Sequence, residues 1–210
     1  MTPSDAAATP AHAATPALRV PESAAAKGAV EVAREFHTTA LVEHCLRSYL
    51  FAAELGRTTG LAFDDELLFV AAMLHDLGLA DAFDHAETSF ELSGGDVARV
   101  FAAGAGWPPP RRRRTAEIID RHMADSVDPA VDPEGYLLCE STGLDISGRG
   151  AERWSPAFLD AVLAAHPRGA LAEDFLACFE SQAARKPHSA PAAALASGLA
   201  IRLRANPLGS

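Results

Sequence analysis

An apolar run that begins near Glu66 ends in the pentapeptide Leu-His-Asp-Leu-Gly, and this stretch constrains the fold more than any other. The run predicts a buried helix, and Gly78 is the expected C-cap because glycine readily adopts the left-handed conformation that ends helices. His75 and Asp76 would then lie side by side in the last turn of an apolar helix. A buried charge is costly unless it is paired or metal-bound, and a helix C-terminus favours a cation. The pair therefore predicts either a hydrogen-bonded core pair or a metal site.

Further polar residues favour the metal site over the core pair. His44 lies upstream on another apolar helical stretch, and His122 and Asp145 follow downstream. A helical bundle can direct side chains from successive helices at one point. His37 precedes His44 by seven residues and shares roughly one helix face with it. We expect His37 to be either a pocket residue or, somewhat more readily, a half-exposed helix histidine.

The composition agrees with a single all-α domain. Alanine and leucine dominate the 210 residues and β-branched residues are sparse, which favours helices. Four prolines interrupt residues 1–27, which are expected to form a flexible arm, whereas residues 28–205 form the folded domain. Helices are expected over residues 28–55, 66–76, 90–103, 134–142, 156–165, 171–185 and 190–204, with another ending near His122. The helix over residues 134–142 should end at Gly143, before Asp145.

Charge and cysteine content restrict the class of protein. The net charge of −10 does not suggest a nucleic-acid partner. The three cysteines lack paired spacing, so they are expected to be small buried hydrophobes. No apolar run reaches the roughly 18 residues of a membrane span, and no secretory signal precedes the domain. We expect a soluble cytoplasmic protein with a small-molecule substrate and no membrane partner, and we leave open a homo-oligomer.

Taken in order, His44, His75-Asp76 and Asp145 resemble the signature of the HD-domain superfamily of metal-dependent hydrolases. Residues 44–51 (HCLRSYLF), 74–79 (LHDLGL) and 89–99 (SFELSGGDVAR) are similar to the cyanamide hydratase-like branch. The resemblance extends over about residues 30–200. It implies a single-domain HD-type helical bundle. It also implies a metal-dependent hydratase or hydrolase in which metal-bound hydroxide adds to a small nitrile- or amide-type substrate.

The resemblance also implies a role for each candidate site residue. His44, His75 and Asp76 would bind one divalent metal ion, with Asp145 as a fourth ligand. Such a set of nitrogen and oxygen donors suits zinc first, with iron or manganese as alternatives. Asp76 and His122 are the expected catalytic residues, and His122 would move protons. With four protein ligands in place, a further ligand would crowd the position that water must occupy.

Arg47, Phe90 and Glu91 are the predicted substrate-binding residues. Arg47 lies three residues after His44 and could clamp an anionic group, or pair with Glu91 or Asp76 as part of the structure. Phe90 and Glu91 occupy the place where two-metal HD enzymes would have a further histidine, which favours a single metal.

Three alternatives remain from the sequence. An HD-type phosphohydrolase would use the same ligands, but phosphate esters generally need several converging cations, and only Arg47 and Arg121 are well placed. An HD-type non-heme iron oxygenase is disfavoured because His85 and His122 are the only further histidines available for a second metal. The third is a non-catalytic ligand-binding module.

The basic run Arg111–Arg114 is expected to be a solvated face.

Overall fold

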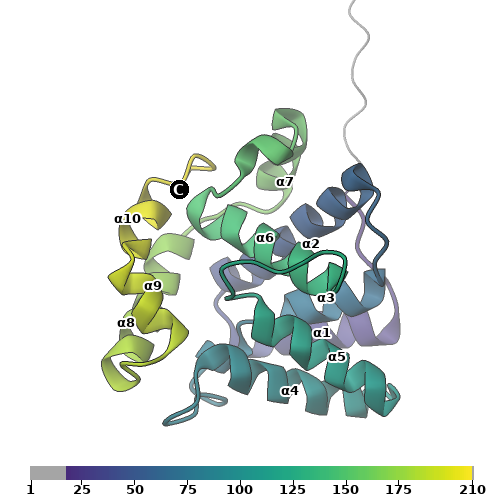
Figure 1. Ribbon diagram of the computed structural model, residues 1–210, viewed down its shortest axis with the longest axis horizontal. Helices are drawn as coiled ribbons and strands as arrows, with labels where there is room; N and C mark the ends of the chain where they lie inside the picture. Colours follow the sequence, from purple (N-terminus) through teal and green to yellow (C-terminus); the bar gives the residue numbers. More distant parts are fainter. Residues whose placement is uncertain (1–17, 210) are drawn as a thin grey trace, which may run out of the picture.

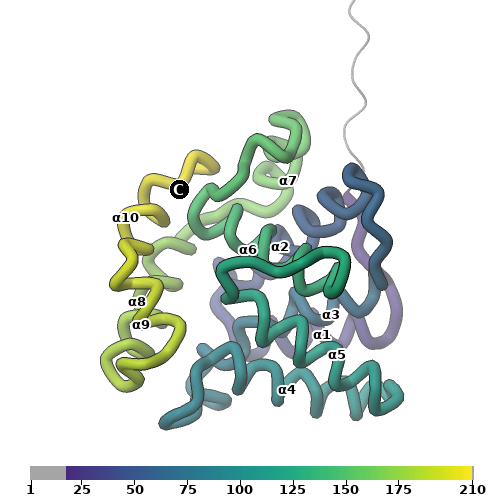
Figure 2. The backbone as a smooth tube through the Cα atoms, in the orientation of Figure 1, coloured from purple at the N-terminus to yellow at the C-terminus, as the bar shows by residue number. Residues whose placement is uncertain are grey.

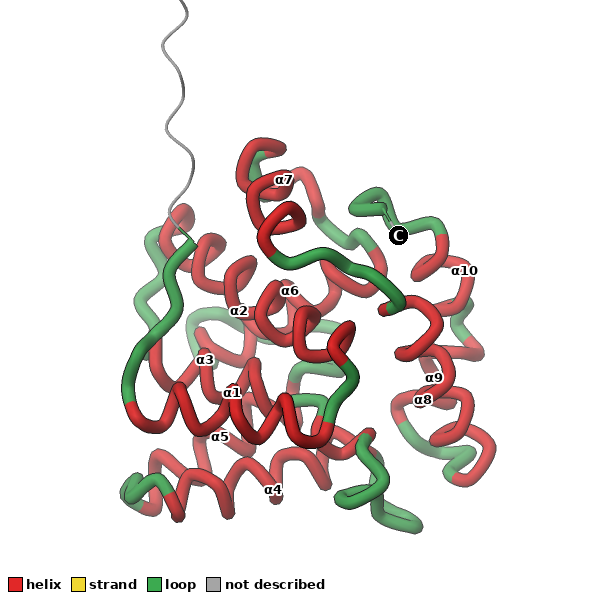
Figure 3. Tube along the Cα trace, turned by 180° about the vertical axis from the view of Figure 1, so that it is seen from behind, coloured by secondary structure: helices red, strands yellow, loops and turns green. Residues whose placement is uncertain are grey.

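The computed structural model describes residues 18–209, and this part of the chain contains helices and loops without strands (Figures 1 and 3). The all-α fold expected from the composition is confirmed. The α-helices are α1 (Ala24–Phe36), α2 (Thr39–Thr59), α3 (Asp65–Leu74), α4 (Phe90–Gly104), α5 (Pro109–Arg121), α6 (Pro133–Ser147), α7 (Pro156–Ala165), α8 (Leu171–Arg185), α9 (Ala190–Ala196) and α10 (Leu199–Arg204), with short 3₁₀ turns η1 (Leu77–Leu79) and η2 (Ala151–Arg153).

Two apolar clusters form the interior. The main cluster surrounds α2 and α3, whose residues are buried on nearly every side, and α1, α4, α5 and α6 cover them. The second cluster joins α8 and α10 to Leu79, Phe90 and Ile146. Helix α8 packs directly on α2 and η1, and α10 packs on α6 (Figure 2). The C-terminal helices therefore reach the middle of the domain through α8 on α2 and through α10 on α6.

The first helical segment differs from the prediction. A single helix was expected over residues 28–55, but α1 ends at Phe36 and α2 begins at Thr39. His37 and Thr38 between them are extended, and the Thr38 side chain caps α2 by accepting from the Leu41 backbone N–H. Helix α1 begins at Ala24, inside the predicted arm of residues 1–27. Residues 1–17 of that arm lie outside the described residues.

Three helix ends were predicted wrongly. Gly78 does not cap α3, since its φ is not positive and it lies within η1. Glycine is required there because a Cβ would overlap the backbone carbonyl of Phe90. Helix α6 does not end at Gly143 but continues to Ser147, so Asp145 lies on the helix. The last predicted helix is divided into α9 and α10 at Gly198, which has a φ of 87°.

Charged residues of α5 hold neighbouring helices in place. Arg111 binds Asp64, the N-cap of α3, and Arg114 binds Asp132, the N-cap of α6. Their side chains are only 26% and 25% exposed, so these two arginines are not part of a solvated face.

None of the described helices combines the length and apolar character that crossing a bilayer requires.

Candidate metal centre

Three predicted ligands converge where the C-terminal end of α3 packs against the first turns of α2. His44 lies on α2, and His75 and Asp76 follow the last residue of α3. The Nε2 atoms of the two histidines are 3.2 Å apart. Asp76 Oδ2 lies 3.6 Å from His44 Nε2 and 3.3 Å from His75 Nε2. All three side chains are 1% exposed, and one donor atom from each could bind the same ion.

Hydrogen bonds to the other ring nitrogens direct the lone pairs of the histidines. His44 Nδ1 lies 2.6 Å from Asp145 Oδ2. The Nδ1 atoms of His75 and His122 lie 2.8 Å and 2.6 Å from the backbone carbonyl oxygen three residues earlier. Because each partner can only accept, each neutral ring carries its proton on Nδ1 and leaves Nε2 free. A histidine metal ligand commonly has this arrangement.

The Asp76 carboxylate lacks its own partner. Neither oxygen makes a hydrogen bond within the described residues, although both are buried. Burial alone would raise the pKa of Asp76, but the facing histidines, His75 first, hold that pKa well below its usual value. The carboxylate is therefore ionised although it is only 1% exposed. A buried, ionised carboxylate beside two Nε2 lone pairs fits a divalent cation.

The three histidines differ in their tendency to take a proton. Burial lowers the pKa of His44, and the hydrogen bond to Asp145 only partly offsets this effect. Burial, followed by the charge of His75, lowers the pKa of His122 to about 3. Burial would also lower the pKa of His75, but the Asp76 carboxylate more than offsets it and the pKa is raised. A proton on His75 thus balances Asp76, and a bound cation would replace that proton.

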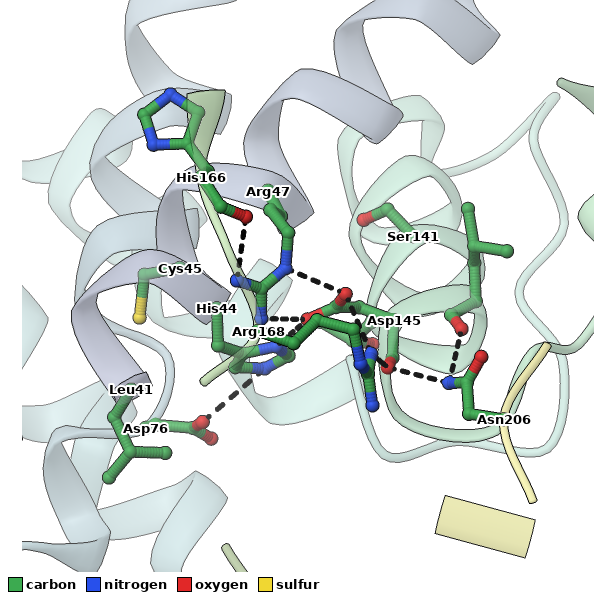
Figure 4. Close-up of polar contacts among 12 residues, drawn as sticks. Leu41, His44, Cys45, Arg47, Asp76, Ser141, Asp145, His166, Arg168 and Asn206 are labelled. Atoms are coloured by element: carbon green, nitrogen blue, oxygen red, sulfur yellow. Dashed lines mark hydrogen bonds and ion pairs between the residues drawn. The ribbon is translucent and has the colours of Figure 1, made fainter. Parts of the chain in front are cut away.

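The structure does not bring Asp145 into this group. Its carboxylate accepts from Arg47 Nε at 2.9 Å and Nη2 at 2.8 Å, and from Arg168 Nη1 at 3.1 Å. Asn206 donates to its backbone carbonyl at 2.8 Å. Figure 4 shows Asp145 and Asp76 on opposite sides of the His44 ring. Asp145 therefore contacts the candidate metal centre through His44.

The predicted substrate-binding residues lie behind the site. Arg47 is fully buried, and the bonds to Asp145 and to two backbone carbonyls occupy its guanidinium. Phe90 is also fully buried, with its ring packed against His122 and Phe179. Glu91 accepts from the Ser89 hydroxyl at 2.6 Å. None of the three lines the cavity described below, so the structure does not support direct contact with a substrate.

A cavity of about 460 Å³ opens onto the metal-binding group. His44, His75, Asp76 and His122 form one end of it. One face of α6 forms a side through Cys139, Thr142, Gly143 and Ile146, which follow helical spacing. His122 is 5% exposed, and its Nε2 lies 4.0 Å from Asp76 Oδ1. The predicted catalytic histidine and three of the four predicted ligands thus share one cavity.

The opposite wall was missed by the sequence reasoning. It comes from α8–α10 and includes Phe175, Phe179, Leu199 and Arg202. Arg149, which follows α6 and also lines the cavity, was missed as well. The spacing of Phe175 and Phe179, four residues apart on an apolar helix, was the available signal, but it is also the ordinary pattern of a core-facing helix.

The comparison with known proteins agrees with this geometry. The model of the HD domain family matches residues 41–144. This part of the chain is an HD domain, the class of domain generally found in metal-dependent hydrolases. The matched residues include His44, His75, Asp76 and His122, and the match ends one residue before Asp145. No curated protein matches the chain.

Proposed function

We propose that the protein is a metal-dependent hydratase or hydrolase, of the cyanamide hydratase-like kind, that acts on a nitrile- or amide-type group. The observation that carries this proposal is the buried group of His44, His75 and Asp76 at the end of the cavity. The two buried arginines nearest to this group, Arg47 and Arg168, are bound to Asp145 on the far side of His44. Among the described residues, the reacting end of the cavity therefore lacks the converging cations that a phosphate ester generally needs.

In this proposal His44, His75 and Asp76 hold one divalent cation, with zinc preferred because its usual donors match the set. When bound, such an ion lowers the pKa of a water molecule to about 7 and polarises an electrophilic carbon. Asp145 holds the Nδ1 proton of His44 and so presents Nε2 to the ion. Burial alone would raise the pKa of Asp145, but the charge of Arg47 and the hydrogen bonds to His44 and Arg47 hold that pKa well below its usual value, so the carboxylate is ionised.

His122 is the proposed proton carrier. Its low pKa leaves the ring neutral at physiological pH, and its free Nε2 faces the cavity. A neutral imidazole there can accept a proton from an attacking water and pass it to the substrate nitrogen. Asp145 faces away from His44 Nε2, His75 and Asp76, so it does not supply a fourth ligand. His122 could instead be the fourth ligand of the metal ion. Metal content of a His122 variant distinguishes these two roles.

The test combines metal analysis with two substrate panels. Purified protein should contain about one divalent metal ion per chain and convert cyanamide to urea, or hydrate nitriles from a panel of increasing size. The variants His75→Ala and Asp76→Ala should each lose the metal, whereas His188→Ala, which removes an exposed histidine, should retain it. No turnover of cyanamide or of any nitrile, with ready release of phosphate from nucleotides, would refute the proposal. Full metal content in either ligand variant would refute the site.

A further inference from the structure

The C-terminal helices determine what the cavity can accept. Much of its apolar lining comes from Phe175, Phe179, Ala193, Ala194 and Leu199. All of these residues lie beyond residue 144, where the match to the HD domain family ends. The part of the chain that matches the family therefore supplies the metal-binding group, and the part that follows it supplies most of the apolar surface against which a substrate would lie.

The size of the cavity indicates a substrate larger than a simple nitrile. A water molecule occupies roughly 30 Å³ of liquid, so 460 Å³ corresponds to on the order of fifteen small heavy-atom groups. Cavities of roughly 300–1,000 Å³ generally hold organic ligands with several apolar groups. A substrate that fills this cavity has an apolar body beyond its reacting end. Phe175 and Phe179, with stacked rings 4.1 Å apart, provide the surface for that body.

Two guanidinium groups add positive charge to the lining. Arg202 Nη1 donates to the Ser197 carbonyl at 2.5 Å and Nη2 to the Ser197 hydroxyl at 3.1 Å. No carboxylate of the described residues forms an ion pair with Arg202. Arg149 Nη2 donates to the Cys139 carbonyl at 2.8 Å and lies 3.8 Å from Glu140. Both side chains keep donor capacity for a ligand.

Gly143 on α6 makes room for the guanidinium of Arg149. Gly143 lines the cavity in the interior of the helix, where glycine costs about 1 kcal/mol relative to alanine. A Cβ at this position would stand 2.5 Å from Arg149 Nη2. The absence of a side chain lets the Arg149 guanidinium lie flat on the cavity face of α6. The guanidinium is thus held at the lining by a local feature of the sequence.

The lining also contains one acidic residue outside the metal-binding group. Asp125 is exposed and follows the end of α5, close to His122 in the chain. With Glu140 near Arg149, it reduces the net positive charge of the lining. Two guanidinium groups, of which Arg149 already lies near Glu140, suit a single negative charge better than a phosphate dianion, which prefers several cations.

We propose that the substrate carries a carboxylate that Arg149 and Arg202 bind, with an apolar body between this carboxylate and the group that reacts at the metal centre. The substrate class is thus an amphipathic small organic acid with a nitrile- or amide-type group at the other end. This inference rests on the proposed function, because the reacting end is placed by His44, His75 and Asp76.

The test uses alkyl hydroxamates, which bind active-site metals through one end. The metal-loaded protein is titrated calorimetrically with acetohydroxamate. It is then titrated with hydroxamates of two to six methylenes that end in a carboxylate, a neutral amide, a methyl or a phosphonate. At the best length, the carboxylate should bind about tenfold more tightly than the amide. Arg149→Gln and Arg202→Gln should each remove most of this preference and leave acetohydroxamate affinity unchanged. Arg204→Gln, an exposed arginine of α10 outside the lining, should retain the preference.

The outcomes separate this inference from the proposed function. Equal affinity for the carboxylate and the amide, with acetohydroxamate bound normally, would overturn the carboxylate subsite and leave the metal centre intact. Tighter binding of the phosphonate than of the carboxylate would overturn it in favour of a phosphate-bearing substrate. If the protein cannot be loaded with metal and no hydroxamate binds, acetohydroxamate included, both the carboxylate subsite and the proposed function are overturned.

Discussion

Replacing Asp145 by asparagine tests how the buried network supports the metal centre. The change preserves shape but removes a charge that faces Arg47 on one side, Arg168 on another and His44 Nδ1 on a third. Arg47 and Asp145 are fully buried, and Arg168 is 4% exposed. Breaking a buried ion pair from one side costs about 3–5 kcal/mol, because it leaves an uncompensated buried charge. Total stabilities are about 5–15 kcal/mol, so we expect a large loss of stability.

The same substitution should weaken metal binding by a second route. An asparagine oxygen can still accept from His44 Nδ1, but it no longer supplies a negative charge to increase the basicity of the ring. Loss of such an outer partner typically lowers metal affinity about 10- to 100-fold. We therefore expect Asp145→Asn to bind the metal more weakly without losing the site.

Two measurements and one further substitution distinguish these effects. Urea unfolding of the metal-free protein gives the change in the free energy of unfolding, and competition with a chelator at low temperature gives metal affinity for the folded fraction. Adding Arg168→Gln to Asp145→Asn removes one of the two uncompensated cations. The double variant should recover part of the stability but not the metal affinity.

Either of two results would contradict these expectations. If Asp145→Asn loses the metal as completely as His75→Ala and Asp76→Ala do, then Asp145 is a direct ligand, as the sequence predicted. If the double variant is no more stable than Asp145→Asn alone, then uncompensated charge is not the source of the instability.

Three further predictions concern single residues. His122→Ala should keep its metal and lose turnover by roughly 10²- to 10⁴-fold, measured on one preparation; a fall in metal content would make His122 a ligand. Gly78→Ala should destabilise by about 1–3 kcal/mol in urea because its Cβ would overlap the Phe90 carbonyl, whereas Gly104→Ala, with open space around it, should not destabilise. Burial and neighbouring carboxylates raise the pKa of Asp120 to about 6 in the native state. Above that pH the ionised carboxylate is less favourable in the native state than in the unfolded chain, and it therefore destabilises the protein. Asp120→Asn should therefore add about 1 kcal/mol at pH 8, allowing for solvent screening, and the gain should vanish as the pH falls toward 4.

Much of the local structure followed from the sequence alone. Apolar spacing predicted the helices ending near His75 and His122 and those over residues 156–165 and 171–185, because helical periodicity depends on residues three and four apart. His75 and Asp76 are neighbours in the chain, so their joint position at the end of α3 needed no tertiary information. The break at His37 and Thr38 was missed because neither proline nor glycine marks it.

Tertiary structure decided which polar residues meet. Asp145 lies 101 residues from His44 and 98 from Arg47, and the rotation of α6 between α2 and the C-terminal segment directs its carboxylate toward the arginines. The order of the residues along the chain predicted that Asp145 would lie near the site. It did not predict whether the carboxylate would face the metal-binding group or the opposite side of the His44 ring. The wall of the cavity depends likewise on how α8 packs against α2 and α10 against α6, through apolar contacts that many sequences could make. Local periodicity therefore determined the helices and the His-Asp pair, whereas long-range packing determined the partner of His44 and the shape of the space before the metal centre.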